Sequence, residues 1–205
     1  NALGADTLGS NSTALGTGAL QTQNFTTATD TYNTAVGFLA GAAGTTGVNN
    51  TLIGALAGDA LTDADHNTAV GRASLSADTL GSKSTALGFQ ALASQNFTTA
   101  TDVENVAVGF NAGVSISTGI NNTLIGGSAG DSGTTAANNV IVGFNSDLTA
   151  VDTAQVIVLG SGVTSQAANN FTFGFGSTDS NIAFGATSIS APSDERYKEN
   201  IATST

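Results

Sequence analysis

Residues 33–37 read Asn-Thr-Ala-Val-Gly, and this five-residue phrase returns with small changes along most of the chain. Its copies end at the glycines Gly16, Gly37, Gly54, Gly71, Gly88, Gly109, Gly126, Gly143 and Gly160. Successive spacings between these glycines are 21, 17, 17, 17, 21, 17, 17 and 17 residues. The pattern therefore has a period of 72 residues, and residues 12–30 realign with residues 84–102.

A period near 17 is too short for a helix pair or a propeller blade, but it suits one coil of a β-solenoid. Thr, Val and Ile favour strands, and Gly and Asn favour tight turns. The sequence therefore predicts an all-β fold, a β-solenoid or β-roll of about 17-residue coils. With coils about 4.8 Å apart, some ten coils would form a rod of roughly 50 Å.

The strand in each coil has two apolar faces, because neighbouring side chains in a strand point to opposite sides. The first face carries Ala35, Leu52, Ala69, Ala86, Ala107, Leu124 and Ile141. The second face carries Val36, Ile53, Val70, Leu87, Val108, Ile125 and Val142. A thin coil has one interior, so we expect the second face to pack against another chain.

Two further columns recur in the coils. Three residues after the repeat glycine the side chain is small, which fits a crowded axis or a sharp corner: Ala40, Ala57, Ser74, Ala91, Ala112, Ala129 and Ser146. Asparagines precede the strand, and they suit either left-handed turns or a stacked amide ladder: Asn33, Asn50, Asn67, Asn105, Asn122 and Asn139.

Composition excludes several classes of function. No run of about 18 apolar residues is present, so we expect no insertion into a membrane. The net charge is −11 with four Lys and Arg residues in all, which makes nucleic acid a poor partner. Cysteine is absent, which excludes disulfides and thiolate metal sites. We expect no cofactor and no metal, and we interpret His66, with Asp63 and Asp65 nearby, as part of a solvated turn.

The repeats between residues 10 and 160 resemble the heads of trimeric autotransporter adhesins (YadA-like) and repeats in phage tail fibres. Those heads are β-rolls of short coils, although a 17-residue coil is longer than the usual adhesin repeat. The resemblance implies a homotrimer around one threefold axis, which agrees with a strand that is apolar on both faces.

Residues 193–201 read Ser-Asp-Glu-Arg-Tyr-Lys-Glu-Asn-Ile, with Tyr197 where the related motif usually has Leu. This stretch resembles the opening of the endosialidase-type intramolecular chaperone, which trimerises, templates the fibre and is released by self-cleavage between Ser and Asp. The resemblance implies that Ser193 is the nucleophile, that Asp194 begins the released part and that Lys198 activates the serine. A serine needs such a neighbour to become nucleophilic. The alternative, which can hold together with it, is that Ser193 is a helix N-cap.

We expect three regions: β-roll repeats at 1–160, an aromatic-rich cap or transition at 161–192, and the truncated start of the chaperone at 193–205. Two insertions, at residues 23–30 and 95–102, should leave the rod as lateral loops, and loops on rigid scaffolds often carry recognition. The candidate receptor contacts are Phe25, Thr26, Thr27, Phe97, Thr98 and Thr99. The alternative for the two phenylalanines is that they tuck under the loop as a satellite core.

The expected function is that of a structural, non-enzymatic fibre segment of a phage tail or related appendage in the virion. It would act in host attachment through a cell-surface receptor or glycan, with single-turnover self-cleavage as its one chemical step. The alternative is a trimeric adhesin head on a bacterial cell surface.

Overall fold

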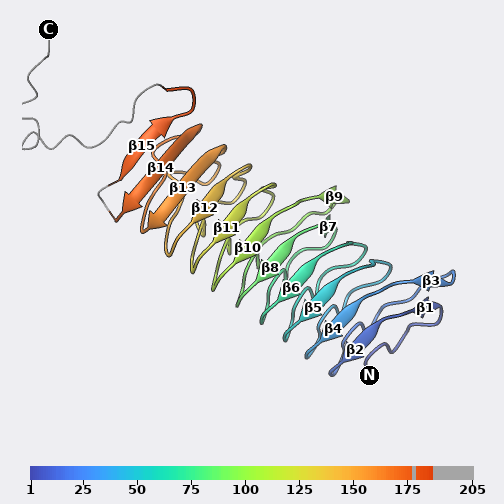
Figure 1. Ribbon diagram of the computed structural model, residues 1–205. Coiled ribbons are helices and arrows are strands. Elements are labelled where there is room, and N and C mark those ends of the chain that lie inside the picture. Colours follow the sequence, from blue (N-terminus) through green and yellow to red (C-terminus); the bar gives the residue numbers. More distant parts are fainter. Residues whose placement is uncertain (177–178, 187–205) are drawn as a thin grey trace, which may run out of the picture.

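The computed structural model describes residues 1–176 and 179–186. Each coil contributes one short strand, and the strands stack into one sheet along the length of the rod (Figure 1). The sheet has eleven strands in the order β15-β14-β13-β12-β11-β10-β8-β6-β5-β4-β2. All neighbouring pairs in it are parallel except β14 and β15, which are antiparallel.

The first eight copies of the repeat phrase form strands of three residues. They are β2 (Thr13–Leu15), β4 (Thr34–Val36), β5 (Thr51–Ile53), β6 (Thr68–Val70), β8 (Thr85–Leu87), β10 (Val106–Val108), β11 (Thr123–Ile125) and β12 (Val140–Val142). Longer strands end the sheet: β13 (Val156–Ser161), β14 (Asn170–Phe175) and β15 (Ser180–Ala183). The all-β solenoid with coils about 17 residues apart is therefore confirmed.

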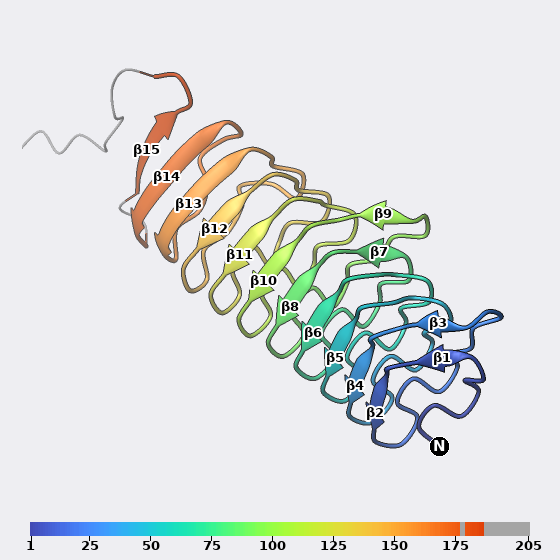
Figure 2. The same ribbon diagram turned by 45° about the vertical axis from the view of Figure 1, so that its right-hand side comes forward.

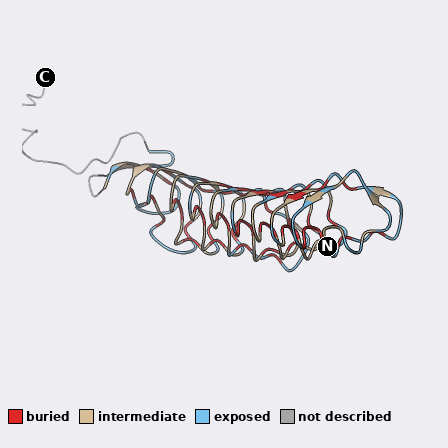
Figure 3. Cartoon of the chain, turned by 90° about the horizontal axis from the view of Figure 1, so that it is seen from below, coloured by how far each residue is buried: buried red, intermediate tan, exposed pale blue. Residues whose placement is uncertain are grey.

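The register of the sheet follows the repeat. Ala35 lies beside Leu52, which lies beside Ala69, so equivalent residues stack on one another from coil to coil. The first face of each strand is buried within the chain, where Ala35 and Ala69 are fully buried. Figure 3 shows that buried segments recur in the coils along the rod. The core is thus a narrow column of small and medium apolar side chains that runs the length of the solenoid.

The repeat glycine is required by the close approach of successive coils. At Gly54 the backbone has a φ of +134°, and a Cβ there would lie 2.6 Å from the carbonyl oxygen of Gly71 in the next coil. The small column three residues later is fully buried inside the single chain, as Ala40 and Ala57 show. The small column therefore lies at the corner of a coil, which is one of the two expectations for it.

The buried asparagines form the amide ladder. Each side-chain oxygen accepts a hydrogen bond from the backbone of the next coil, as Asn33 does from the Asn50 N–H at 2.9 Å. Each side-chain amide donates to a backbone carbonyl, as Asn33 does to Gly47 at 2.7 Å. The left-handed conformation falls one residue earlier, for example at Asn49 with a φ of +59°.

Both insertions leave the rod sideways, as expected. Each forms a small two-stranded parallel sheet with the preceding coil (Figure 2). β1 (Gly9–Ser10) pairs with β3 (Thr29–Asp30), and β7 (Gly81–Ser82) pairs with β9 (Thr101–Asp102). We call these two features the lateral projections, with their loops at residues 24–30 and 96–102.

The C-terminal end of the described rod differs from the coils before it. β13 crosses the expected boundary at residue 160, and β14 continues the same parallel sheet. Within β14 the residues alternate, with Thr172 fully buried between half-buried Phe171 and Phe173. Residues 181–185 read Asn-Ile-Ala-Phe-Gly, which resembles the repeat phrase, but they do not add a further parallel coil, because β15 runs antiparallel to β14.

Candidate interaction surfaces

The second face of the strands is open to solvent in the single chain. We call it the outer face. In each strand it is formed by the residue before and the residue after the buried one, so two columns of side chains run along the rod. One column holds Leu15, Val36, Ile53, Val70, Leu87, Val108, Ile125, Val142, Leu159 and Phe173. Its members are half-buried or exposed, with Leu15 at 66% and Leu87 at 44% of their full exposure.

The other column of the outer face begins each strand. It holds Thr13, Thr34, Thr51, Thr68, Thr85, Val106, Thr123, Val140, Ile157 and Phe171. Neither column contains a charged residue. A continuous uncharged stripe of this length on the surface of one chain indicates an interaction surface, because isolated soluble proteins expose few contiguous apolar patches.

Aromatic residues extend this stripe at the turn that follows the strand. Phe38, Phe110 and Phe144 directly follow repeat glycines and are exposed. The rings of Phe89 and Phe110 stack in adjacent coils with centroids 5.2 Å apart, and the Arg72 guanidinium lies 5.6 Å from the Phe89 ring centre. Large exposed aromatics beside an apolar sheet face are typical of the core of a protein interface.

The lateral projections present hydroxyl groups and bury their aromatic rings. Phe25 and Phe97 are buried, while the four threonines predicted as receptor contacts, Thr26, Thr27, Thr98 and Thr99, are exposed. Neither ring belongs to the main core of the rod. Of the six candidate contact residues, the four threonines are therefore exposed, and the two phenylalanines are buried in the way that the satellite-core alternative expects.

A buried polar network holds each projection to the rod. The Gln95 amide donates to the Asp78 carboxylate at 2.6 Å and to the Ser84 hydroxyl at 3.1 Å. Its oxygen accepts from the Asn105 side chain at 2.9 Å. The other Asp78 oxygen accepts from the Phe97 N–H at 3.0 Å, so this fully buried carboxylate is satisfied.

The glutamine contacts recur one 72-residue period earlier, where the Gln23 amide donates to the Asp6 carboxylate and the Ser12 hydroxyl and the Gln23 oxygen accepts from the Asn33 side chain. These glutamine and aspartate residues are absent from the sequence-based predictions. Their signal was present, since Ser replaces Asn in the ladder column at the start of each 21-residue coil, and the inserted glutamine replaces the missing amide.

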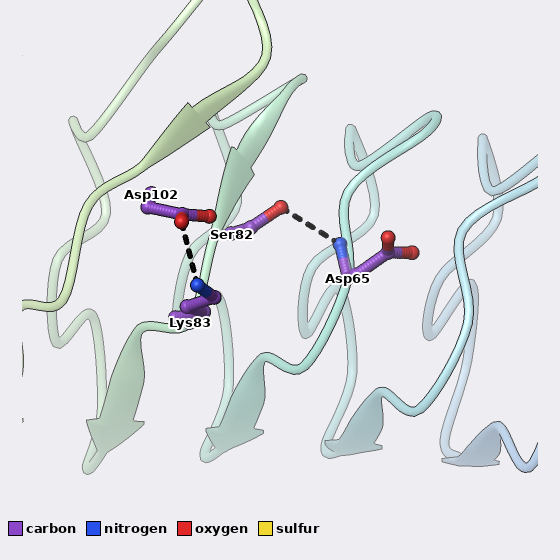
Figure 4. Close-up of polar contacts among 4 residues, drawn as sticks. All are labelled: Asp65, Ser82, Lys83 and Asp102. Atoms are coloured by element: carbon purple, nitrogen blue, oxygen red, sulfur yellow. Dashed lines mark hydrogen bonds and ion pairs between the residues drawn. The ribbon is translucent and has the colours of Figure 1, made fainter.

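The base of the second projection carries an ion pair on the surface (Figure 4). The Lys83 ammonium lies 2.5 Å from the Asp102 carboxylate, and this hydrogen bond raises the pKa of Lys83 above its ordinary value. Beside it the Asp65 N–H donates to the Ser82 hydroxyl at 2.9 Å. Asn11 takes the place of Lys83 in the first projection, where its amide donates to Asp30 at 2.8 Å.

Two equivalent carboxylates near the turns have perturbed pKa values. Burial raises the pKa of Asp59, and one of its side-chain oxygens is buried without a hydrogen-bond partner. Burial raises the pKa of Asp131 as well, and the nearby charge of Asp147 adds to the effect. Across the described ranges no group of three or more His, Cys, Asp or Glu side chains could hold a metal ion.

The residues of the predicted self-cleavage junction, Ser193, Asp194 and Lys198, lie outside the described residues. His66 is exposed, and one ring nitrogen lies 3.4 Å from the Asn49 amide. In the part of the chain that the structure describes, no helix has the length and apolar character needed to cross a membrane.

A comparison with protein-family models gave no match, and no curated protein or solved structure matches the chain either.

Proposed function

We propose that this chain is a segment of a homotrimeric fibre of a phage tail or related appendage, located in the virion and acting in host attachment. The observation that carries the proposal is the outer face, an uncharged and largely apolar stripe that is half-buried or exposed in every coil of the rod. Burial of such a stripe removes apolar area from water, which is the main driving force for association.

A further copy of the same chain is the partner that this stripe fits best. The outer face repeats once per coil, at the strand spacing of about 4.8 Å. A partner can match it in every coil only if it has the same period along its whole length. Another copy has that period by construction, and identical chains close into cyclic assemblies. The number three rests on the resemblance of the repeats to trimeric fibres and adhesin heads.

In the assembled fibre the rod would act as a stiff support rather than as an enzyme. Each chain carries two lateral projections with the same loop, Asn-Phe-Thr-Thr-Ala-Thr-Asp, at residues 24–30 and 96–102. A trimer would present several copies of each loop to the host surface. Weak contacts of the exposed threonines with a receptor or glycan would then add up through avidity.

Maturation through a C-terminal chaperone is the second part of the proposal. It rests on the resemblance of residues 193–201, in which Ser193 would be the nucleophile, Asp194 the first released residue and Lys198 the activating group. The test is to express the longest form of the protein that its source encodes, with and without Ser193→Ala. We expect a gel to show cleavage that Ser193→Ala abolishes, and persistence of the uncleaved form in both would overturn this part.

Oligomerisation is tested on the chain itself by sedimentation equilibrium. We expect a mass of three 20.0 kDa chains. Because the chain has no cysteine, a single introduced thiol also reports on the packing of the outer face. Ile53→Cys should form an interchain disulfide on mild oxidation, whereas Thr26→Cys on a projection should not. A monomeric mass with no cross-link at residue 53 would overturn the fibre proposal.

The alternative is a trimeric adhesin head on a bacterial cell surface, which would have the same roll. The two are separated by where the protein is found. Antibodies that label purified virions support the tail fibre, and labelling of uninfected bacteria supports the adhesin.

A further inference from the structure

The outer face changes its chemistry along the rod. In the column that begins each strand, the five N-terminal strands of the main sheet all carry threonine, followed by Val106 and Thr123. The last three strands, β12, β13 and β14, carry Val140, Ile157 and Phe171 at this position. The column that begins with Leu15 is apolar throughout and ends in Leu159 and Phe173. The stripe is therefore half polar at the N-terminal end and fully apolar at the C-terminal end.

In the N-terminal coils, which we call the threonine rows, outer-face threonines have hydroxyl groups without a hydrogen-bond partner among the described residues. Within the described residues the hydroxyls of Thr34, Thr51 and Thr68 make no hydrogen bond, unlike that of Thr62, which donates to the Thr79 carbonyl at 3.0 Å. Water satisfies such hydroxyls in the free chain. An interface that covers them must replace that water, so these rows add little net affinity unless a neighbouring chain supplies a partner.

The C-terminal rows carry no such cost. Val140 and Ile157 are each 39% exposed and Leu159 is 49% exposed, so their apolar area stays open in the single chain. Phe171 and Phe173 lie on the same face with ring centroids 5.0 Å apart. Apart from the Ser161 hydroxyl, which donates to the Phe144 carbonyl at 3.4 Å, the side chains that an interface would cover here are apolar, and their transfer out of water favours association.

We propose that copies of this chain bind one another mainly through the outer face of β12, β13 and β14, and that the threonine rows align afterwards with little contribution to affinity. This inference rests on the fibre proposal for its partner, a second copy of the chain. The copy is argued from the continuity of this C-terminal patch with the repeating outer face. A uniform face could bind at several axial offsets, whereas a distinct apolar end favours the arrangement in which like ends meet.

The chain offers a matched pair of variants for the test. Val106→Thr and Val140→Thr make the same change at equivalent positions two coils apart. Both side chains point outward, and threonine already occupies this position in neighbouring strands, so both variants should keep the solenoid fold. The readout is the dissociation constant of the assembly from sedimentation equilibrium of the full chain, with circular dichroism to verify the fold.

We expect Val140→Thr combined with Ile157→Thr to raise the dissociation constant by at least about tenfold, and Val140→Thr alone to raise it more than Val106→Thr. Conversely, Thr51→Val with Thr68→Val should tighten the assembly, because two unpaired hydroxyls disappear. Equal effects of Val106→Thr and Val140→Thr in a wild-type protein that does assemble would overturn this inference and leave the fibre proposal standing. A wild-type chain that stays monomeric would overturn both.

Discussion

The side-chain oxygen of Asn50 accepts a hydrogen bond of 2.9 Å from the backbone N–H of Asn67, one coil further along the rod. Asn67 in turn accepts from the Ser84 N–H at 2.9 Å and donates to the Gly81 carbonyl at 2.9 Å. All these groups are buried. The ladder therefore satisfies buried N–H groups that directly precede β6 and β8, together with the Gly81 carbonyl.

Removal of one rung should destabilise the chain strongly. Asn67→Ala leaves the buried Ser84 N–H and the buried Gly81 carbonyl unpaired, and each such group costs about 1–3 kcal/mol. We expect the free energy of unfolding to fall by about 2–5 kcal/mol in urea denaturation followed by circular dichroism. Asn49→Gly is the control, because Asn49 is exposed with a φ of +59° that glycine adopts readily. An equal loss in both variants would contradict a role for the ladder.

A second prediction compares equivalent positions in the two 72-residue blocks. Gly44 lines an internal cavity of about 10 Å³, whereas the equivalent Ile116 is buried and fills that place in the other block. A Cβ at Gly44 would lie 3.2 Å from the Gly41 carbonyl oxygen, and this close contact offsets part of the gain, so Gly44→Ala should stabilise the fold by at most about 0.5–1 kcal/mol. Ile116→Ala should destabilise the fold by about 2–5 kcal/mol. Gly41→Ala is the control and should destabilise the fold, since the φ of Gly41 is +60° and a Cβ there would lie 2.7 Å from a Leu52 methyl group. Unfolding curves of the three variants decide the matter.

The sequence predicted the solenoid because one feature, the glycine spacing, fixes coil length, strand position and the buried face together. Ala35 and Val36 show how far this reached: alternation assigned them to opposite faces, and the structure buries Ala35 while Val36 stays half-exposed. The choice between a turn and a ladder for Asn50 was beyond reach, because both need a small amide at the same place. The hydrogen-bond partners are set by neighbouring coils.

The predicted recognition residues were separated only by the structure. Phe97 and Thr98 are adjacent in sequence, but Phe97 is buried and Thr98 is exposed. The direction of each side chain depends on how the four extra residues fold back onto the preceding coil, which no local pattern specifies. Asp78 was not singled out at all, because a carboxylate near a turn is ordinary and its buried partners come from residues 95 and 97.

The pKa shift of Asp131 gives a pH-dependent prediction. Its folded-state pKa lies above the ordinary value of 3.8, so the folded state favours the protonated form. Ionisation therefore costs stability, and that cost appears as the pH rises from 3.8 through the raised folded pKa. Asp131→Asn should stabilise the chain at neutral pH, and its advantage should shrink as the pH falls towards 3.8. Urea denaturation at several pH values measures the difference.

Asp59→Asn serves as the comparison for that experiment. Burial raises the pKa of Asp59 in the same direction, and no neighbouring carboxylate contributes to the shift. Its advantage should therefore change with pH in the same sense but stay insensitive to Asp147→Asn, whereas the effect of Asp131→Asn should become smaller in that background. An advantage that grows on acidification would contradict the assignment for either residue.

A charged residue on the outer face should prevent assembly without unfolding the chain. Ile125 is 40% exposed in the single chain, so Ile125→Lys places an ammonium group on the surface without disturbing the core. If the face packs against other copies, the buried unpaired charge should give a folded monomer. Sedimentation velocity and circular dichroism measure the two properties. Thr99→Lys, on an exposed projection, should leave the assembly intact, and a trimer that tolerates Ile125→Lys would exclude this face as the interface.

In the lateral projections, the buried phenylalanine should affect local stability, and the exposed threonines should affect binding. Phe97→Ala removes a buried ring at the base of the loop, so we expect faster hydrogen exchange in residues 95–102 with little change in the rod, because that ring lies outside the main core. Replacement of the exposed Thr26, Thr27, Thr98 and Thr99 by alanine should leave exchange unchanged and weaken binding of labelled protein to host cells. A variant in which the threonines of only one loop are replaced should retain partial binding, because both loops contribute through avidity. Full binding by the fourfold variant would show that the threonines do not contact the receptor.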